Sequence, residues 1–268
     1  MNLFIELNNL VLKYRFYPKK GSGIHFVKKE SLLEEILRLS NLKKSDKVLE
    51  VNAGEFFIAR EISKKASLTA FEQRTELIPL LKKELPKINL INASFVSYSK
   101  KLNVNKCVSF FSSGNLSDNF SKLFYFDFDL MVLLLPKEFA EKILAEPGFV
   151  DYGFAGVLTD SFFEVIEVVE VQSDYFFPPT SGEFCLIKLK KNKVKLKNKK
   201  EFFEFVKILF RFKNRVFVSA LTKALPLMKL DEKTKSKIKK KLNEIEFNQK
   251  VYLMESSEFI ELFSELIK

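Results

Sequence analysis

The sequence predicts an α/β fold: a mostly parallel sheet of seven strands with an antiparallel end, followed by a small all-α C-terminal domain. Between residues 30 and 145, short apolar segments alternate with segments of helical periodicity, which is typical of a parallel sheet covered by helices. The next two apolar segments alternate only partly and are joined through Pro178-Pro179, which indicates an antiparallel pair. From about residue 197 onward, only helical periodicity remains.

The individual elements follow from these periodicities in chain order. In the first helix, Leu33, Ile36 and Leu37 recur at helical spacing, with polar residues between them. We expect helices over residues 30–42, 56–65, 76–85 and 137–145. We expect parallel strands over residues 47–51, 68–72, 88–91, 107–111 and 129–135, and the closing antiparallel pair over residues 163–171 and 184–189.

Three segments divide the chain. Residues 1–28 are expected to form an N-terminal arm, residues 29–196 the α/β domain, and residues 197–268 a basic helical C-terminal domain. Hydrophobic residues make up 47% of the 268, so the chain can bury a core and is not a disordered protein. The last helix is expected to pack through an apolar face made of Phe259, Leu262, Phe263 and Leu266.

Positive charge is concentrated in the last third of the chain. The net charge of the chain is +11; residues 188–250 contain 21 Lys and Arg against 6 Asp and Glu, which gives this segment +15 and leaves −4 for the remainder. Two lysine-rich blocks, 188–200 and 233–241, flank an aromatic-rich helix. Each block alone is consistent with a helix face or a linker that is exposed to solvent. Two blocks with Arg211 and Arg215 between them favour a phosphate-binding surface. A nucleic acid is therefore expected as the partner in preference to a membrane.

The composition also excludes several classes of protein. Cys107 and Cys185 are too few for a disulfide scaffold or a four-ligand zinc site, and a single histidine excludes a His-rich metal cluster. No apolar run reaches the length of about 18 residues that a membrane helix needs. The first nine residues lack the basic segment of a secretory signal. We expect a cytoplasmic monomer that binds neither a metal nor a membrane.

One stretch of the α/β domain carries a specific pattern. It reads Phe128-Asp129-Leu130-Met131-Val132-Leu133, then Glu138-Phe139-Ala140-Glu141-Lys142, then Ala145-Glu146-Pro147-Gly148, then Asp151-Tyr152-Gly153. This order closely resembles the ribosomal RNA adenine dimethyltransferase family, which methylates adenines near the 3′ end of small-subunit rRNA. Residues 19–27 resemble the family's basic arm, and residues 209–221 the start of its helical domain. The resemblance implies a Rossmann-like methyltransferase sheet, S-adenosylmethionine as cofactor, and small-subunit rRNA or a pre-ribosomal small subunit as partner.

The resemblance assigns the cofactor-binding residues. The family's motif Glu-Ile-Gly-Pro-Gly-x-Gly stands here as Glu50-Val51-Asn52-Ala53-Gly54-Glu55-Phe56, so only the central glycine, Gly54, is kept. Asn52 tolerates the left-handed conformation that glycine provides, whereas Phe56 either fills the cofactor's methionine end or packs inward and widens the turn. Glu72 matches the acid that accepts the ribose hydroxyls. The other matched positions are His25, Val27 and Asn92, the last in place of an aspartate that contacts adenine.

The catalytic motif is where the sequence departs most from the family. Counting back from Phe128 aligns the family's Asn-(Leu/Ile)-Pro-Tyr with Phe110-Phe111-Ser112-Ser113, whereas Asn115-Leu116-Ser117-Asp118 lies five residues too late. Phe110 offers no acceptor for the amino hydrogens of adenine, and Ser113 offers no ring to stack on the base. Each lost contact costs about 10²- to 10³-fold in rate. The motif positions in this chain are Phe110, Ser112 and Ser113.

The leading hypothesis is a family member that keeps the fold and RNA binding, has weak or no methyl transfer, and serves ribosome assembly. One alternative is an active methyltransferase with an unusual site, in which Phe110 or Phe111 stacks on the base. Another is a protein-interaction or transcription-accessory module on the same fold. The residues expected to bind RNA are Lys19, Lys20, Lys190, Lys191, Arg211, Lys213, Arg215, Lys239 and Lys240.

Overall fold

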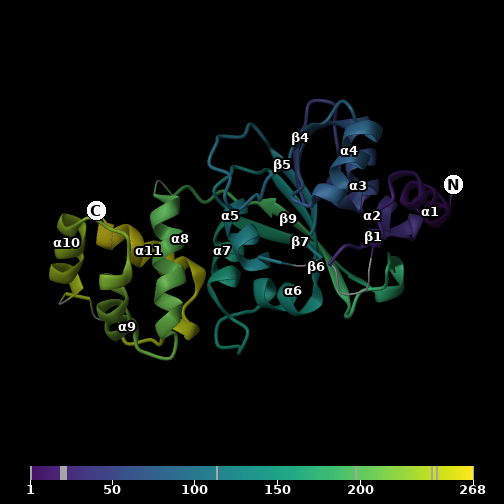
Figure 1. Ribbon diagram of the computed structural model, residues 1–268. Helices are drawn as coiled ribbons and strands as arrows, with labels where there is room; N and C mark the ends of the chain where they lie inside the picture. The colour runs from purple at the N-terminus through teal and green to yellow at the C-terminus, as the bar shows by residue number, and fades with distance from the viewer. Residues whose placement is uncertain are drawn as a thin grey trace. The chain divides into compact units, whose positions relative to one another are not determined.

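The computed structural model describes residues 2–18, 23–112, 114–196, 198–242, 244–245 and 247–267. The chain forms two compact units (Figure 1). Unit 1 comprises Met1–Ala140 and Val165–Lys191 and holds the sheet; unit 2 comprises Glu141–Glu164 and Asn192–Lys268 and is mainly helical. The segment 141–164 thus groups with the C-terminal helices, although it precedes two strands of the sheet in the sequence. The expected division into 1–28, 29–196 and 197–268 stays a prediction.

The sheet has seven strands, which are β2 (Lys47–Val51), β3 (Ser67–Phe71), β4 (Asn89–Ile91), β5 (Lys106–Phe110), β6 (Leu130–Pro136), β7 (Phe163–Val171) and β9 (Phe184–Lys191). Their order across the sheet is β4-β3-β2-β5-β6-β9-β7. The pairs from β4 to β6 are parallel, and β9 runs antiparallel to β6. The predicted fold class is therefore confirmed. A separate antiparallel pair, β1 (Phe26–Val27) with β8 (Phe176–Phe177), was not anticipated because each strand has only two residues.

Helices cover both sides of the sheet in unit 1. In Figure 1, α2 (Glu30–Ser40), α3 (Phe57–Lys65) and α4 (Ile78–Glu84) lie on one side, and α5 (Leu116–Leu123) and α6 (Lys137–Leu144) on the other. The four helices expected from the sequence are present with nearly the expected bounds. The helix α5 was not expected, because Asn115 to Asp118 at its start were considered only as a match to the catalytic motif.

The N-terminal segment contains a helix, α1 (Leu3–Tyr14), where the sequence indicated only an arm. Asn2 caps its first turn through the side-chain oxygen. At the other end of the helix, Lys13 pairs with Glu84 of α4 at 2.6 Å. The apolar face of α1 is part of the core of unit 1 through Leu3, Leu7 and Leu10.

Unit 2 packs its helices around aromatic side chains. The helices are α7 (Phe154–Phe162), α8 (Lys199–Leu209), α9 (Phe217–Ala224), α10 (Glu232–Leu242) and α11 (Ser256–Ile267). The rings of Phe202 and Phe205 in α8 each lie 5.3 Å from the ring of Phe263 in α11, centroid to centroid. The apolar face predicted for the last helix is confirmed, since all four of its residues are buried: Phe259, Leu262, Phe263 and Leu266.

Short 3-10 turns complete the chain: η1 (Ala53–Glu55), η2 (Thr75–Leu77), η3 (Ser173–Tyr175), η4 (Phe210–Phe212), η5 (Leu225–Leu227) and η6 (Val251–Leu253). Across the described residues, no helix is both long enough and apolar enough to cross a membrane. The described side chains also include no group of three or more His, Cys, Asp or Glu residues that could hold a metal ion.

Candidate functional site

The sheet of unit 1 reverses its strand order between β2 and β5. From β2 the chain proceeds to β3 and β4 on one side, whereas from β5 it proceeds to β6 on the other side. In open α/β sheets, such a reversal leaves a crevice outside the carboxyl ends of the two strands, and ligands bind there. The residues that follow β2, β3, β4 and β5 are therefore the candidates for a functional site.

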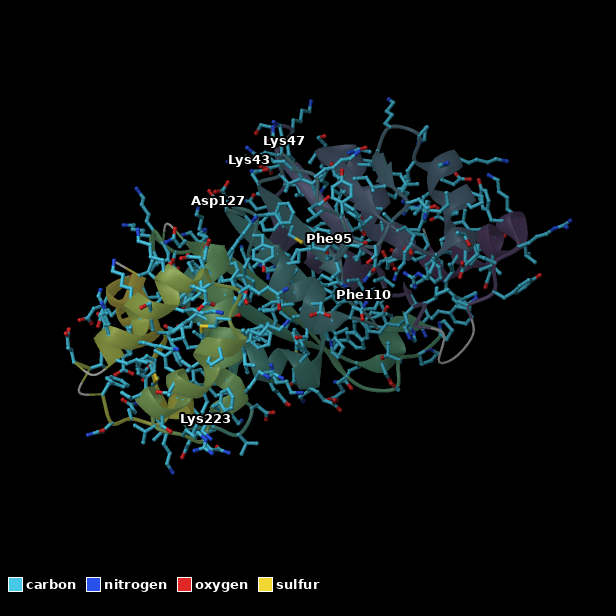
Figure 2. All side chains as sticks on the ribbon, turned by 60° about the vertical axis from the view of Figure 1, so that its left-hand side comes forward. Lys43, Lys47, Phe95, Phe110, Asp127 and Lys223 are labelled. Atoms are coloured by element: carbon cyan, nitrogen blue, oxygen red, sulfur yellow. The ribbon has the colours of Figure 1, made fainter. Side chains whose placement is uncertain are left out.

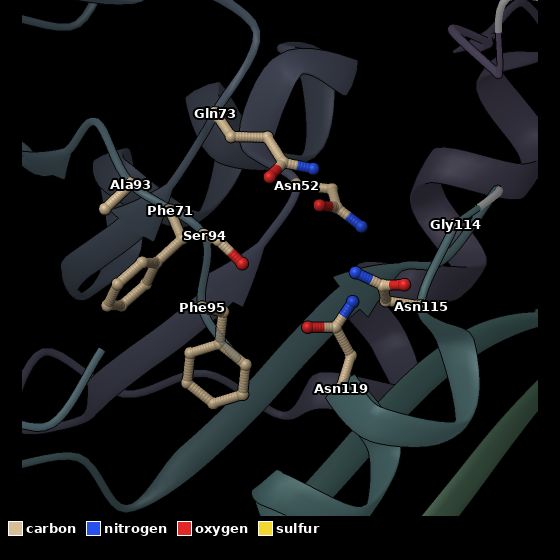
Figure 3. A pocket seen from close by; sticks show the side chains of 9 residues that line it. All are labelled: Asn52, Phe71, Gln73, Ala93, Ser94, Phe95, Gly114, Asn115 and Asn119. Carbon is tan, nitrogen blue, oxygen red and sulfur yellow. The ribbon is translucent and has the colours of Figure 1, made fainter. Parts of the chain in front are cut away.

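A cavity of about 100 Å³ lies at this place (Figure 3). Figure 3 shows the side-chain amides of Asn52, Gln73 and Asn119 turned toward a common space, with Asn115 beside them. None of the described residues that line the cavity carries a charge, which suits a polar but uncharged ligand group. The full lining is Asn52, Phe71, Gln73, Ala93, Ser94, Phe95, Gly114, Asn115 and Asn119.

Of the residues predicted to bind the cofactor, Asn52 alone lines this cavity. Sequence reasoning missed Gln73, Ser94 and Asn119, and it set Asn115 aside because its register did not match the catalytic motif. A usable signal existed, because Gln73 and Ser94 stand one or two residues beyond positions already placed at strand ends. Polar residues immediately after the carboxyl ends of parallel strands are candidates in any sheet of this class.

The turn after β2 has two residues with positive φ. Asn52 adopts the left-handed conformation, with φ 63° and ψ 54°, as its position in the motif predicted. Phe56 has φ 65° and ψ −55°, a conformation that costs a bulky residue about 1–3 kcal/mol. Its ring is buried in the core, 5.5 Å from the ring of Phe57, and does not line the cavity. Of the two outcomes expected for Phe56, the structure shows inward packing.

Gly54 is required because other side chains approach it closely. Its amide donates to Oε2 of Glu72 at 2.7 Å. A Cβ atom on residue 54 would lie 2.3 Å from Cδ1 of Leu77 and 2.5 Å from the same Glu72 oxygen. The space that glycine leaves open beside this turn is therefore filled by the protein itself.

Both oxygens of Glu72 already accept hydrogen bonds from this chain. Oε1 accepts from the amide and from Nε of Arg74, both at 2.9 Å. Oε2 accepts from the amide of Gly54 at 2.7 Å and from Nη2 of Arg74 at 3.1 Å. The side chain of Glu72 is 0% exposed. A carboxylate offers about four acceptor positions, so none remains for ribose hydroxyls, and Glu72 as arranged here does not fit the ribose of S-adenosylmethionine.

Two further carboxyl groups are buried near this turn, those of Glu50 and Glu55. Burial raises the pKa of Glu55 to about 8, although the amides of Ile58 and Val27 donate to it at 2.7 and 2.8 Å. Burial also raises the pKa of Glu50 well above its usual value, and the nearby carboxyls of Glu55 and Glu72 raise it further. Neither oxygen of Glu50 has a hydrogen-bond partner among the described residues. Both effects favour the protonated, uncharged form of the Glu50 carboxyl.

The other predicted cofactor residues lie near the turn but not in the cavity. Nδ1 of His25 lies 2.7 Å from the carbonyl oxygen of Pro178. Val27 is buried in β1. Asn92 is exposed, and its side-chain amide donates to the backbone oxygen of Glu72 at 2.8 Å. The cofactor-binding roles of these residues stay predictions.

The residues aligned with the catalytic motif lie at and after the end of β5. The ring of Phe110 is buried in unit 1 (Figure 2), where it stacks on Phe176 with centroids 5.1 Å apart and meets Phe184 at 5.5 Å. The hydroxyl of Ser112 donates to the carbonyl oxygen of Gly23 at 2.7 Å. Ser113 lies outside the described residues. Phe110 thus serves the core, and its side chain presents no polar atom to a substrate.

The residues predicted to bind RNA occur in both units. In unit 1, Lys191 pairs with Asp127 at 2.8 Å. In unit 2, Lys213 is half-buried. Lys19 and Lys20 lie outside the described residues. The others are all exposed: Lys190 in β9, Arg211 and Arg215 at and after η4, and Lys239 and Lys240 in α10.

Comparison with known proteins gives consistent relatives. The sequence model of a family described as ribosomal RNA adenine dimethylase matches residues 16–262. The protein "Ribosomal RNA small subunit methyltransferase A" of Thermotoga maritima is 27% identical over 221 residues, which cover 81% of this chain and 79% of that protein. The protein of the same name from Clostridium perfringens is 29% identical over 240 residues, which cover 84% of each.

Solved structures share the fold. A dimethyladenosine transferase from Plasmodium falciparum has a TM-score of 0.72 at 19% identity, covering 90% of this chain and 96% of that one. The 23S rRNA methyltransferase ErmE has a TM-score of 0.60 at 19% identity, covering 91% of this chain and 100% of that one. Both likenesses extend over the α/β part and the helical part of the chain.

Proposed function

Because the chain belongs to the ribosomal RNA adenine dimethylase family, we propose that it binds small-subunit ribosomal RNA in the cytoplasm during ribosome assembly, and that it transfers methyl groups weakly or not at all. Proteins of this family are methyltransferases that use S-adenosylmethionine as cofactor. The proposal separates two properties, RNA binding and methyl transfer, which are supported by different residues of the chain.

The occupied carboxylate of Glu72 is the observation that carries the proposal. A cofactor whose ribose hydroxyls bind to Glu72 must first displace the guanidinium of Arg74. The guanidinium donates two hydrogen bonds to that carboxylate, and the backbone amide of Arg74 donates a third. Separating a buried ion pair of this kind costs about 3 kcal/mol, taken at the lower end because Arg74 is partly exposed. That cost corresponds to roughly a hundredfold loss in affinity for the cofactor.

The end of β5 supports the same conclusion. The amino nitrogen of adenine is a poor nucleophile because its lone pair is delocalised into the ring, so acceptors that orient its hydrogens matter for the rate. Phe110 has no acceptor, and its ring is enclosed by Phe176 and Phe184. Loss of a positioning contact of this type costs about 10²- to 10³-fold in rate.

The distribution of charge supports the binding of RNA. Residues 188–250 carry 21 Lys and Arg against 6 Asp and Glu, a net charge of +15. The helix α10 buries Ile238 and Leu242 and leaves Lys239 and Lys240 exposed, so one face packs and the other is free to meet phosphates. A concentration of positive charge on exposed lysines is the usual footprint of a nucleic-acid partner.

A calorimetric titration with S-adenosylmethionine tests the loss of methyl transfer. We expect binding roughly a hundredfold weaker than at a site with an open carboxylate, and only a small rise in melting temperature at millimolar ligand, because Glu72 is engaged by Arg74 and Gly54. The Thermotoga maritima relative, titrated under the same conditions, serves as the reference. Binding in the micromolar range would contradict the proposal and would make Phe110 and Ser112 the residues to mutate next.

The salt dependence of RNA binding tests the other half of the proposal. We expect the logarithm of the association constant for a small-subunit rRNA fragment to fall linearly with the logarithm of salt concentration, with a slope of about −0.7 to −0.9 for each phosphate contacted. Fluorescence anisotropy at several salt concentrations gives this slope. An association constant that does not change with salt, or no binding, would contradict the proposal that the chain binds RNA.

An active methyltransferase with an unusual site is the second candidate function. The observation in its favour is the cavity beside Asn52 and Gln73, which lies at the switch point where ligands of such sheets bind. The same titration decides between the two candidates, because an active enzyme must bind its methyl donor. The uncharged lining offers no ionic partner to a charged cofactor, and for this reason we favour the first candidate.

A further inference from the structure

A rigid turn in unit 2 presents apolar side chains to solvent. The amide of Phe149 donates to the carbonyl oxygen of Glu146 at 3.2 Å, and Gly148 between them has φ 90°. Proline at the second position and a glycine with positive φ at the third are the signature of a type II turn, and residues 147 and 148 are Pro and Gly. Glu146, Pro147 and Gly148 of this turn belong to the stretch of sequence that resembles the family most closely, and residues 149 and 150 stand between its quoted segments.

The turn is fixed on both sides by hydrogen bonds within unit 2. The amide of Gly148 donates to the carbonyl oxygen of Tyr252 at 2.8 Å. The ammonium group of Lys213 donates to the carbonyl oxygen of Val150 at 3.0 Å. On the far side, the buried hydroxyl of Tyr152 donates to the carbonyl oxygen of Met254 at 2.8 Å. The loop is therefore preorganised, and a ligand that binds it need not order it first.

The exposed side chains of this loop have no role in the core of unit 2. Phe149 is 63% exposed and Val150 is 87% exposed. Leu253 is 39% exposed and lies beside them, since a Cβ atom on Gly148 would be 3.5 Å from its Cδ2 atom. We call Phe149, Val150 and Leu253 the Phe149 patch. Apolar side chains gathered around one fixed turn and exposed to water are candidates for an interaction site.

Positive charge lies next to the Phe149 patch. The backbone carbonyl of Lys213 accepts from Tyr252 at 3.1 Å, and that of Arg215 accepts from Val251 at 3.0 Å, so the segment 211–215 runs alongside the segment that carries Leu253. Arg211 and Arg215 are exposed. The exposed acids near the Phe149 patch equal the cations of segment 211–215 in number: Glu146, Asp151 and Glu255 against Arg211, Lys213 and Arg215.

We propose that the Phe149 patch stacks on an unpaired base of an RNA strand while Arg211, Lys213 and Arg215 contact the neighbouring phosphates. An aromatic ring beside cations is the arrangement that binds unstacked bases of single-stranded RNA, loops and bulges. A protein partner would also cover an apolar patch, but the three cations belong to the segment 188–250, whose net charge of +15 favours a polyanion. The proposal rests on the RNA-binding function proposed above and adds the class of RNA: a strand with unstacked bases in preference to a continuous duplex.

The test compares variants of Phe149 in the full-length chain. The probes are a single-stranded oligoadenylate that contains one 2-aminopurine and a blunt duplex RNA of the same length. We expect Phe149→Ala to weaken binding of the single strand roughly tenfold or more, to abolish the change in 2-aminopurine fluorescence, and to leave duplex binding unchanged. Phe149→Tyr should restore binding because it keeps a ring, whereas Phe149→Leu should not. Leu227→Ala, which removes another exposed apolar side chain of unit 2, is the matched control and should bind like the wild type.

Salt dependence separates the stacking contact from the phosphate contacts. Phe149→Ala should keep the slope of the wild type, whereas Lys213→Met should make the slope shallower by about one. If Phe149→Ala or Phe149→Leu binds the single strand as tightly as the wild type, stacking is wrong while RNA binding stands. If Phe149→Ala weakens binding only to intact small subunits and not to RNA, the patch contacts a protein, which also overturns the proposal. If the wild type binds neither probe, RNA binding and stacking are both wrong.

Discussion

Arg74→Ala is expected to destabilise the protein by about 3 kcal/mol and, at the same time, to make it responsive to S-adenosylmethionine. The substitution removes the guanidinium and leaves the backbone amides of Gly54 and residue 74 as the partners of the buried Glu72 carboxylate among the hydrogen bonds described above, so the free energy of unfolding should fall. It also frees the acceptor positions that ribose hydroxyls need. Urea denaturation with and without millimolar cofactor measures both effects in one experiment.

A conservative variant separates charge from geometry at this site. Arg74→Lys keeps the positive charge but cannot reproduce the forked contacts to Oε1 and Oε2 of Glu72, so it should lie between the wild type and Arg74→Ala in stability. If Arg74→Ala is as stable as the wild type, the ion pair is not formed in solution and the argument from Glu72 fails. If it is destabilised but still unresponsive to cofactor, the occupation of Glu72 by Arg74 is not what prevents cofactor binding.

The free energy of unfolding is expected to fall as the pH rises from 5 to 8. Burial raises the pKa of Glu55 from 4.5 to about 8, so the folded chain keeps a proton that the unfolded chain has released. The contribution of Glu55 to the free energy of unfolding is fully present below pH 4.5 and is lost as the pH rises through 8. Between these values the free energy of unfolding falls by about 1.4 kcal/mol per pH unit. Glu50, whose pKa is also raised by burial, acts in the same direction. Denaturant titrations at each pH give the slope.

Glu50→Gln isolates the contribution of the unpartnered carboxyl. Glutamine has nearly the same shape and does not ionise, so the variant should match the wild type near pH 5 and exceed it in stability near pH 8. Glu76→Gln, at an exposed position in the same unit, is the control and should leave the slope unchanged. Equal slopes for Glu50→Gln and the wild type would show that Glu50 is not buried in solution.

Groups with lowered pKa values do not mask this trend. Burial tends to raise the pKa of Asp46, but hydrogen bonds from Lys106, Lys43 and Asn105 hold it below its usual value. A group of this kind contributes stability that is present above its usual pKa and lost as the pH falls. Its effect is therefore confined to acid below about pH 4, outside the interval in which Glu50 and Glu55 act.

The fold could be predicted from the sequence where an element is long or strongly apolar. The run from Leu130 to Leu135 identifies a strand buried on both faces, and the partial alternation from Phe163 to Val171 identifies the closing strand. The two-residue strands β1 and β8 are too short for periodicity to reveal, and the start of α5 was considered only as a match to the catalytic motif. The helix at residues 3–14 was missed although Leu3, Leu7 and Leu10 recur at helical spacing, because the segment was assigned to the N-terminal arm.

The positions of the candidate-site residues could be predicted from the sequence, but the contacts and orientations of their side chains could not. The end of β3 places Glu72, and the backbone of Asn52 is left-handed as its residue type allowed. The ion pair between Arg74 and Glu72 depends on the side-chain conformation of Arg74. A pattern of residue types does not specify such a conformation. The same holds for Phe56, whose ring could have turned either way, and for the orphaned carboxyl of Glu50, because burial of a single acid depends on what packs around it.

The N-terminal helix has a consequence for any attempt to define the boundaries of this protein. The match to the family begins at residue 16, whereas α1 ends at Tyr14, so the helix lies outside the matched residues. Its three leucines nevertheless belong to the same core as the family's own strands, and the ring of Phe4 meets that of Phe177 with centroids 5.0 Å apart. A fragment trimmed to residues 16–262 would therefore lack part of its own interior, so experiments on an isolated piece of this protein should keep α1.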